Sequence, residues 1–258
     1  PTPEENPPDK VKLEEWVSAH NRPDIHGVAR FIADNINYIS FEEFLGALKK
    51  TTDSIVKEIG DKPYVVLQTS SGKSDSWVYS IAKQWLPREP EAVVMTKNLG
   101  EWMSQHPQVE NVVYFDDAAY SSQQIDDWVI RVIEGDKRLE KVNINLVIPF
   151  MSARAEERLK KRQPNKQNFI ADHEKLVTIG ELLEYISDTV ARARIKKTLL
   201  EMDDWYDDFK TLTYFAHKNP DLVSTYSAMI DGEVKDRRGE VFKTIRFIRE
   251  TKPPYKLR

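Results

Sequence analysis

The sequence predicts an α/β protein with a mostly parallel central sheet, helices on both faces of that sheet, and helical additions at the N- and C-terminal ends. After Gly60, short apolar runs alternate with helical patterns, which is the order expected of a strand–helix–strand series. The runs YVVL at 64–67 and VVYF at 112–115 contain no alternating polar residues. Uninterrupted apolar runs are typical of parallel strands covered on both faces, and the connections between such strands are expected to be right-handed.

The segment before this series is predicted to be helical. Residues 1–9 contain four prolines and no apolar face, so we expect them to form a disordered leader outside the fold. Residues 10–60 are expected to form an N-terminal helical extension. Its clearest helix begins after Ser40, which can form a capping box with Glu43, and ends at Gly60.

Residues 61–258 are expected to form the α/β domain together with a C-terminal helical addition. Beyond Arg162 the alternation weakens, and one long helical stretch is predicted from Ile179 to about Phe209. The run TLTYF at 211–215 is a further strand candidate. The last part of the sheet is therefore less sharply defined by the sequence than the part between Gly60 and Arg162.

Composition narrows the class of protein. The net charge is −4 and the 38 Lys and Arg residues are spread along the chain, so there is no basic stripe that would indicate nucleic-acid binding. The absence of cysteine excludes disulfides and thiolate metal sites, and no apolar run approaches the ~18 residues of a membrane span. No HExxH zinc motif or GxSxG serine-hydrolase motif occurs. We expect a soluble, cytoplasmic protein; the sequence leaves open delivery into a host cell as an effector.

The stretch LQTSSGKSDSW at 67–77 lies between a predicted strand and a predicted helix, where parallel sheets bind ligands. Its GKS ending is that of a Walker A loop, but the glycine required five residues before Gly72 is replaced by Leu67. The letters SGKSDS also approach the SGGxDS loop of ATP pyrophosphatases, with Lys73 in place of the second glycine. That second interpretation predicts ATP binding that depends on Ser71 and Asp75.

The end of a second predicted strand carries a longer and more specific sequence pattern than the 67–77 stretch. In ENVVYFDDAAYSSQQI, residues 110–125, an apolar strand leads into Asp116 and Asp117, then into small and hydroxyl residues, and then into a helix. This stretch resembles the phosphoribosyl pyrophosphate signature of type I phosphoribosyltransferases: four apolar residues, an acidic pair, three residues, Ser or Thr, Gly, any residue, and usually Thr. Ser121 matches the signature, whereas Ser122 replaces its glycine and Gln124 replaces its last threonine.

The chemistry of these residues agrees with the resemblance. A loop at a helix N-terminus presents free N–H groups to a phosphate, and the side chains of Ser121, Ser122, Gln123 and Gln124 add donors. Asp116 and Asp117 are the expected catalytic pair, able to accept hydrogen bonds from ribose hydroxyls and to reach Mg²⁺ indirectly through the ribose or water. The resemblance further implies that Ser71, Gly72, Lys73 and Ser74 bind the pyrophosphate, with Lys73 supplying a positive charge.

Three further residues are candidate donors to a polyanion: Arg154, which follows a predicted strand, and His217 and Lys218. The last two lie in TLTYFAHKNPDLVSTYS, residues 211–227. This segment resembles part of an uncharacterised phosphoribosyltransferase-like branch found in intracellular bacteria and large DNA viruses.

The resemblance implies a phosphoribosyltransferase-like, nucleotide-binding protein with Mg²⁺ as cofactor and a phosphosugar or nucleotide as its small-molecule partner. If active, it would be a glycosyltransferase that transfers ribose 5-phosphate from phosphoribosyl pyrophosphate and releases pyrophosphate. The alternative is an inactive regulatory or effector module with the same fold, and Ser122 is the feature that favours it. A protein partner and a homodimer are both left open by the sequence.

Overall fold

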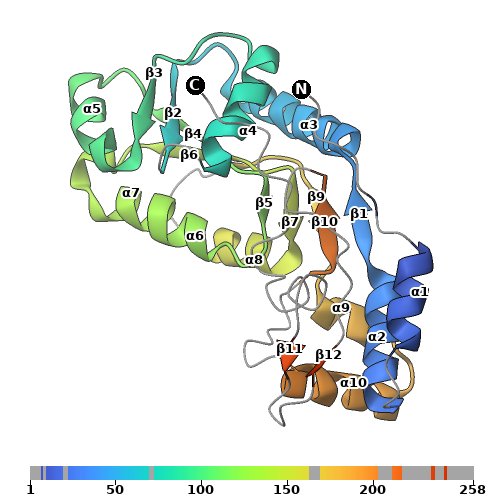
Figure 1. Cartoon of the computed structure of the whole chain (residues 1–258). Helices are drawn as coiled ribbons and strands as arrows, with labels where there is room; N and C mark the ends of the chain where they lie inside the picture. The colour runs from blue at the N-terminus through green and yellow to red at the C-terminus, as the bar shows by residue number, and fades with distance from the viewer. Residues whose placement is uncertain are drawn as a thin grey trace. The chain divides into compact units, whose positions relative to one another are not determined.

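The computed structural model describes residues 7, 10–19, 23–69, 73–162, 169–202, 211–216, 234–235 and 241–242. The chain forms two compact units, which are traced by residue number in Figure 1. The α/β unit is Phe44–Leu176, and the helical unit contains the described residues up to Glu43 and from Val177 onward. These units differ from the predicted division into 10–60 and 61–258, because two segments far apart in the sequence build the helical unit together. The predicted leader lies outside the described residues except for Pro7.

The α/β unit is built on a five-stranded parallel sheet with the order β3-β2-β4-β6-β8 (Figure 1). Both predicted apolar runs form its central strands, and the fully buried pattern of β4 explains why its sequence does not alternate. The predicted mostly parallel sheet is therefore confirmed. The strands are β2 (Tyr64–Gln68), β3 (Ala92–Met95), β4 (Asn111–Phe115), β6 (Asn143–Val147) and β8 (Phe169–Ile170).

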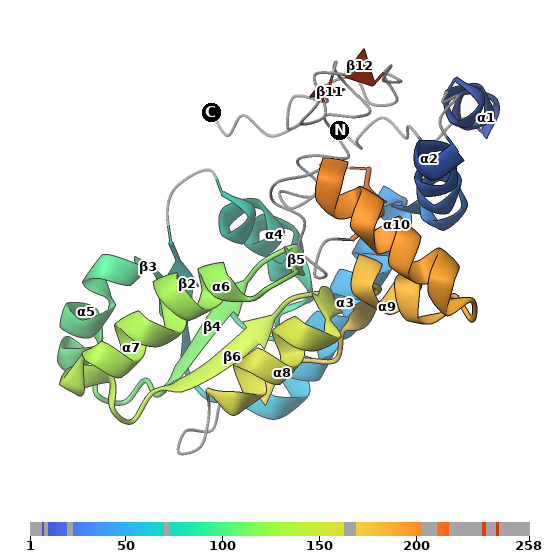
Figure 2. The same cartoon turned by 90° about the horizontal axis from the view of Figure 1, so that it is seen from below.

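Helices cover both faces of this sheet, as predicted. Figure 2 shows α6, α7 and α8 on the near side of the sheet and α3 on the far side. The helix after β4 is continuous from residue 123 to 135, but its middle turn is a π-helix. The elements are α3 (Phe41–Ile59), α4 (Ser74–Ala82), η1 (Lys83–Trp85), η2 (Thr96–Asn98), α5 (Leu99–Gln105), α6 (Gln123–Ile125), the π-turn η3 (Asp126–Ile130), α7 (Arg131–Gly135), η4 (Lys137–Leu139) and α8 (Ala153–Lys161).

The capping box predicted for α3 is present. Ser40 N donates to Glu43 Oε2 at 2.8 Å, and Glu43 N donates back to Ser40 Oγ at 3.1 Å. Gly60 follows the last turn with φ +58°, the left-handed conformation that glycine adopts without steric cost. Both ends of this helix are thus determined by local sequence.

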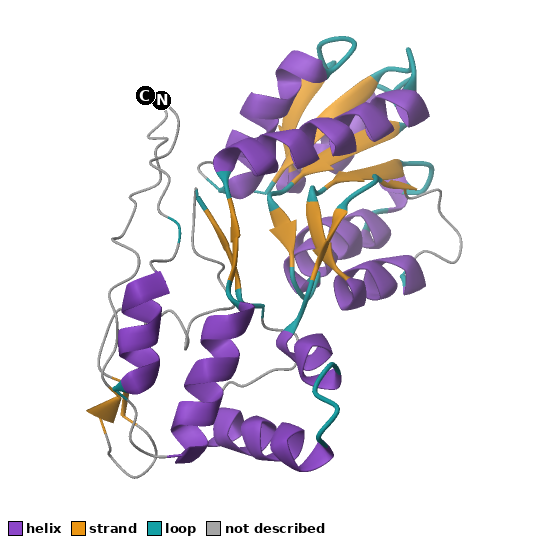
Figure 3. Ribbon diagram, turned by 90° about the vertical axis from the view of Figure 1, so that its right-hand side faces the viewer, coloured by secondary structure: helices purple, strands orange, loops and turns teal. Residues whose placement is uncertain are grey.

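Three neighbouring strands of the five-stranded sheet, β4, β6 and β8, are each followed after a short interruption by a second strand segment. The strands β5 (Ala118–Ala119), β7 (Phe150–Ser152) and β9 (Glu174–Leu176) form a second parallel sheet, whose order repeats that of β4, β6 and β8. At the interruption, Asp116 N donates to Val147 O at 3.1 Å and Glu174 N donates to Pro149 O at 2.8 Å, so backbone pairing continues across it. Figure 3 shows the strands in orange. The acidic pair therefore lies between two strand segments, and the small residues that follow it, which the sequence places between the pair and a helix, include the short strand β5.

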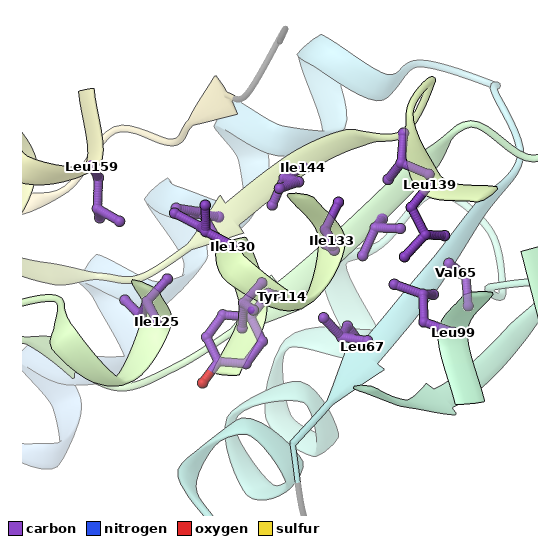
Figure 4. Packing of buried hydrophobic residues seen from close by; sticks show 14 of the residues in the cluster. Val65, Leu67, Leu99, Tyr114, Ile125, Ile130, Ile133, Leu139, Ile144 and Leu159 are labelled. Atoms are coloured by element: carbon purple, nitrogen blue, oxygen red, sulfur yellow. The ribbon is translucent and has the colours of Figure 1, made fainter. Parts of the chain in front are cut away.

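One face of the five-stranded sheet carries the main hydrophobic core of the unit. Side chains from the central strands pack there against α5, the helix after β4, and α8, as the sticks in Figure 4 show. Close packing of this kind fixes the rotation of the helix after β4, and hence the loop that precedes it. Labelled members of the cluster are Val65, Leu67, Leu99, Tyr114, Ile125, Ile130, Ile133, Leu139, Ile144 and Leu159.

The helical unit confirms the predicted additions at both ends of the chain. It contains α1 (Lys10–Ser18), α2 (Pro23–Asn35), α9 (Ile179–Glu184), α10 (Thr189–Met202), the parallel pair β1 (Asn37–Ile39) and β10 (Thr213–Phe215), and the antiparallel pair β11 (Val234–Lys235) and β12 (Val241–Phe242). The single long helix predicted from Ile179 is two helices instead, because Asp188 Oδ1 accepts hydrogen bonds from the N–H groups of Val190 and Ala191 and starts α10.

Within the described residues, no helix combines the length and the apolar character needed to cross a lipid bilayer.

Candidate functional site

The acidic pair is held rigidly between β4 and β5. Asp116 and Asp117 are 5% and 1% exposed. Asp116 Oδ1 accepts a hydrogen bond from Asp117 N at 2.9 Å, and Asp117 Oδ1 accepts one from Ala118 N at 2.9 Å. Each carboxylate is thus oriented by the backbone of the residue that follows it.

Tyr114 connects the pair to a third acid. Its hydroxyl donates to Asp116 Oδ2 at 3.2 Å. Burial raises the pKa of Tyr114 well above its ordinary value, and the negative charges of Asp116, Asp75 and Asp117 raise it further. Tyr114 therefore stays protonated and keeps its donor directed at Asp116. Asp75 belongs to α4, which packs against β4, and its charge acts on the same phenol.

Asp75 is a site residue that the sequence analysis did not assign to this site. It is 1% exposed, and its Oδ2 accepts hydrogen bonds from Thr69 N at 2.5 Å and from Thr69 Oγ1 at 2.7 Å. Within the described part of the chain, its Oδ1 has no hydrogen-bond partner. Asp75, in the first turn of α4, is thus hydrogen-bonded to Thr69 at the other end of the 69–75 loop. The sequence signal for Asp75 is its position within SGKSDS, a pattern that predicts a role for this residue in ATP binding only.

The predicted pyrophosphate loop is described in part. Ser71 and Gly72 lie outside the described residues, whereas Lys73 is exposed and precedes the first turn of α4, which starts at Ser74. Lys73 Nζ lies 5.8 Å from the centroid of the Trp128 ring. Trp128 belongs to the helix that follows the 121–124 loop, so this contact joins Lys73 to that helix.

The 121–124 loop has the backbone form of an anion site. Ser122 adopts φ +57° and ψ +5°, the left-handed conformation, and is the only non-glycine residue with positive φ in the described part of the chain. It is followed at once by the right-handed turn of Gln123–Ile125. Successive N–H groups in such a left-handed to right-handed step form a concave nest for anions. Ser121 is half-buried, Ser122 is buried, and Gln123 and Gln124 are exposed.

Side chains also brace this loop from within. Ser121 Oγ accepts a hydrogen bond from Gln123 N at 3.4 Å, and Ser122 Oγ donates to Ser121 O at 2.6 Å. The sequence analysis identified Ser122 as unsuited to a position that requires positive φ. The structure shows that this position does have positive φ, with the serine in place.

The helix after this loop is anchored by a buried ion pair that the sequence did not reveal. Asp126 is fully buried, and its carboxylate meets Arg158 Nη2 at 3.1 Å and Arg162 Nε at 3.0 Å. Arg158 belongs to α8 and Arg162 directly follows its last residue, and Arg131 Nη2 lies 3.7 Å away as well. Because a buried carboxylate requires such partners, the first π-turn of this helix is fixed against α8.

Of the three remaining predicted donors, the structure describes only Arg154. Arg154 is exposed near the start of α8, where Lys161 mainly, and Arg154 more weakly, lower the pKa of Glu157. His217 and Lys218 lie outside the described residues. The described residues contain no group of three His, Asp or Glu side chains that could hold a metal ion.

The fold and these two loops define a phosphoribosyltransferase-like α/β protein. The model of the PRTase-CE family matches residues 13–222, and the chain belongs to this family. The resemblance inferred from the 112–124 signature is thereby confirmed. The chain is also similar to a crystal structure of a hypothetical protein from Neisseria gonorrhoeae with bound ppGpp, with a TM-score of 0.34 and 12% identity over 63% of this chain and 97% of that chain. No curated protein matches the sequence.

Proposed function

We propose that this protein binds phosphoribosyl pyrophosphate, or a related phosphosugar or nucleotide, across the 121–124 loop and the acidic pair. The observation that carries the proposal is the left-handed Ser122 at the head of the 123–135 helix, directly after the strand segments that hold Asp116 and Asp117. Membership of a phosphoribosyltransferase-like family supports the phosphoribosyl interpretation over the ATP-pyrophosphatase one.

The 5′-phosphate would occupy the nest at residues 121–124. The first turn of a helix has N–H groups without intrahelical partners and carries a partial positive charge, so it favours an anion. Exposed Gln123 and Gln124 supply amide donors at its rim.

The ribose would be held by the acidic pair. Vicinal hydroxyls donate to carboxylates, and Asp116 and Asp117 are already oriented by backbone hydrogen bonds. Mg²⁺, when bound with the donor, would offset the charge of the pyrophosphate. Lys73, exposed at the start of α4, would place an ammonium beside the same group.

An active site of this kind would break the bond between ribose C1 and the pyrophosphate oxygen, and would form a new bond between C1 and a nucleophile. Catalysis would come from holding phosphate, ribose and pyrophosphate in line, because positive charge develops on the ribose in the transition state.

A second candidate, binding without turnover, is favoured by two observations. Ser122 places a Cβ in the left-handed position at the centre of the nest, where the family signature has glycine. In addition, the segment between β3 and β4 folds as η2 and α5, whereas many type I enzymes carry a long flexible catalytic loop there.

Titration calorimetry with phosphoribosyl pyrophosphate and Mg²⁺ tests the shared premise. We expect binding by the wild type and a loss of at least tenfold in affinity in the double variant Asp116→Asn with Asp117→Asn. The matched control is Glu58→Gln with Asp61→Asn, which removes the same charge from exposed positions before β2. Absence of binding, or equal binding by both double variants, would refute the proposal. Release of pyrophosphate across a panel of bases separates the enzyme from the binding module.

A further inference from the structure

Trp128 is a large apolar side chain that lies exposed on the helix after β4. Its side chain is 56% exposed, the highest value for a large apolar residue in the described part of the α/β unit. Its helical neighbours already supply the contacts that hold this helix on the sheet: Ile125, Val129, Ile130 and Ile133. Burying an indole is strongly favourable in water, so its exposure is not explained by the stability of the fold.

The backbone around Trp128 is irregular and fixed. Trp128 lies in the π-turn Asp126–Ile130, and single π-turns inside α-helices are frequent at functional sites. Asp126 anchors this turn to Arg158 of α8 and to Arg162 directly after that helix, so the turn cannot rotate to bury the indole without breaking those ion pairs. The outward position of Trp128 is therefore built into the structure.

A cation from the other loop lies over the indole. Lys73 Nζ is 5.8 Å from the ring centroid, which is within the range of a cation–π interaction. An exposed aromatic face next to an ammonium is suited to a molecule that carries both a flat ring and a phosphate. A nucleotide has both, and a phosphosugar has only the second.

We infer that Trp128 is a stacking surface for the base of a nucleotide ligand whose 5′-phosphate occupies the 121–124 loop. The inference rests on the proposed function and specifies the substrate class of the same site. Trp128 lies four residues beyond Gln124, about 6 Å along the helix axis, which is comparable with the separation of base and 5′-phosphate across a ribose. Stacking accepts every base, because each has a π-face.

The experiment compares a ligand that lacks a base with ligands that carry one. Affinities of ribose 5-phosphate and of AMP, GMP, CMP and UMP are measured by titration calorimetry for the full chain. The variants are Trp128→Ala, Trp128→Phe and, as the matched control, Trp102→Phe on α5, whose ring stacks on His106 away from both loops. Circular dichroism and thermal unfolding verify that each variant folds; an exposed indole is expected to be dispensable for folding.

The wild type is expected to bind at least one nucleoside monophosphate more tightly than ribose 5-phosphate. Trp128→Ala should lower the affinity for that nucleotide about fivefold to a hundredfold and leave ribose 5-phosphate within twofold. Trp128→Phe should keep most of the affinity, and Trp102→Phe all of it. Equal nucleotide affinity in the wild type and Trp128→Ala would overturn this inference while leaving phosphosugar binding intact. No binding of any of the five ligands would overturn the proposed function together with it.

Discussion

The left-handed serine at the head of the 123–135 helix can be tested by a pair of substitutions, Ser122→Gly and Ser122→Ala. Ser122 has φ +57° and is 4% exposed, and its hydroxyl donates to Ser121 O at 2.6 Å. Both variants lose this hydroxyl equally. They differ only in the Cβ, which glycine lacks, so their difference in stability isolates the backbone conformation.

The expected difference follows from two opposing terms. A non-glycine residue in the left-handed region costs roughly 1–2 kcal/mol. Glycine in turn loses about 0.5–1 kcal/mol, because it has more freedom in the unfolded chain. The glycine variant should therefore be more stable than the alanine variant by about 0.5–1 kcal/mol. Loss of the hydroxyl hydrogen bond costs about 1 kcal/mol in both, which leaves glycine near the wild type and alanine below it.

Urea unfolding of the full chain, followed by circular dichroism, measures this difference from the midpoints at a shared slope. A thermal scan should show the glycine variant about 1–4 °C above the alanine variant for a chain of this size. Equal stability of the two variants would refute the reasoning, since it would mean that position 122 does not adopt the left-handed conformation. The glycine variant should also bind phosphoribosyl pyrophosphate at least as tightly as the wild type, because no Cβ restricts the approach of the phosphate.

Two other perturbations follow from the buried charges. Asp126→Asn should lower the free energy of unfolding by about 2 kcal/mol, because charge-assisted hydrogen bonds to two arginines are lost. Asp127→Asn removes a more exposed ion pair and should lower it by less than about 1 kcal/mol. Equal losses for the two variants in urea unfolding would contradict this assignment. The raised pKa of Tyr114 means that its contribution to stability is fully present below the ordinary tyrosine pKa of 10.0 and is lost as pH rises above it. The stability of Tyr114→Phe should therefore decline less steeply than that of the wild type above about pH 10, and parallel curves would show that the phenol does not titrate differently in the folded state.

Local sequence predicted the elements whose determinants are themselves local. The capping box of Ser40 and Glu43 and the left-handed Gly60 define α3, and uninterrupted apolar runs define β2 and β4. The two candidate loops were located because each follows such a strand.

The features that were missed depend on contacts between distant residues. Asp126 meets arginines that are 32 and 36 positions later in the chain, and no local pattern marks that pairing. Asp75 on α4 raises the pKa of Tyr114 on β4, although each residue looks ordinary in its own segment. The pairing of β1 with β10 joins residues 37–39 to residues 213–215, and it makes the first and last parts of the chain one unit.

The interruption of β4, β6 and β8 has a consequence for the length of the signature. Ala118 and Ala119 pair with Phe150 and Met151 in the second sheet, and only Tyr120 then separates them from Ser121. Inserting or deleting one residue between Asp117 and Ala118 would shift this pairing by one position and turn its side chains to the opposite face. The pairing of the second sheet therefore constrains the spacing between the acidic pair and Ser121. This constraint would persist in a variant that had lost every phosphate contact.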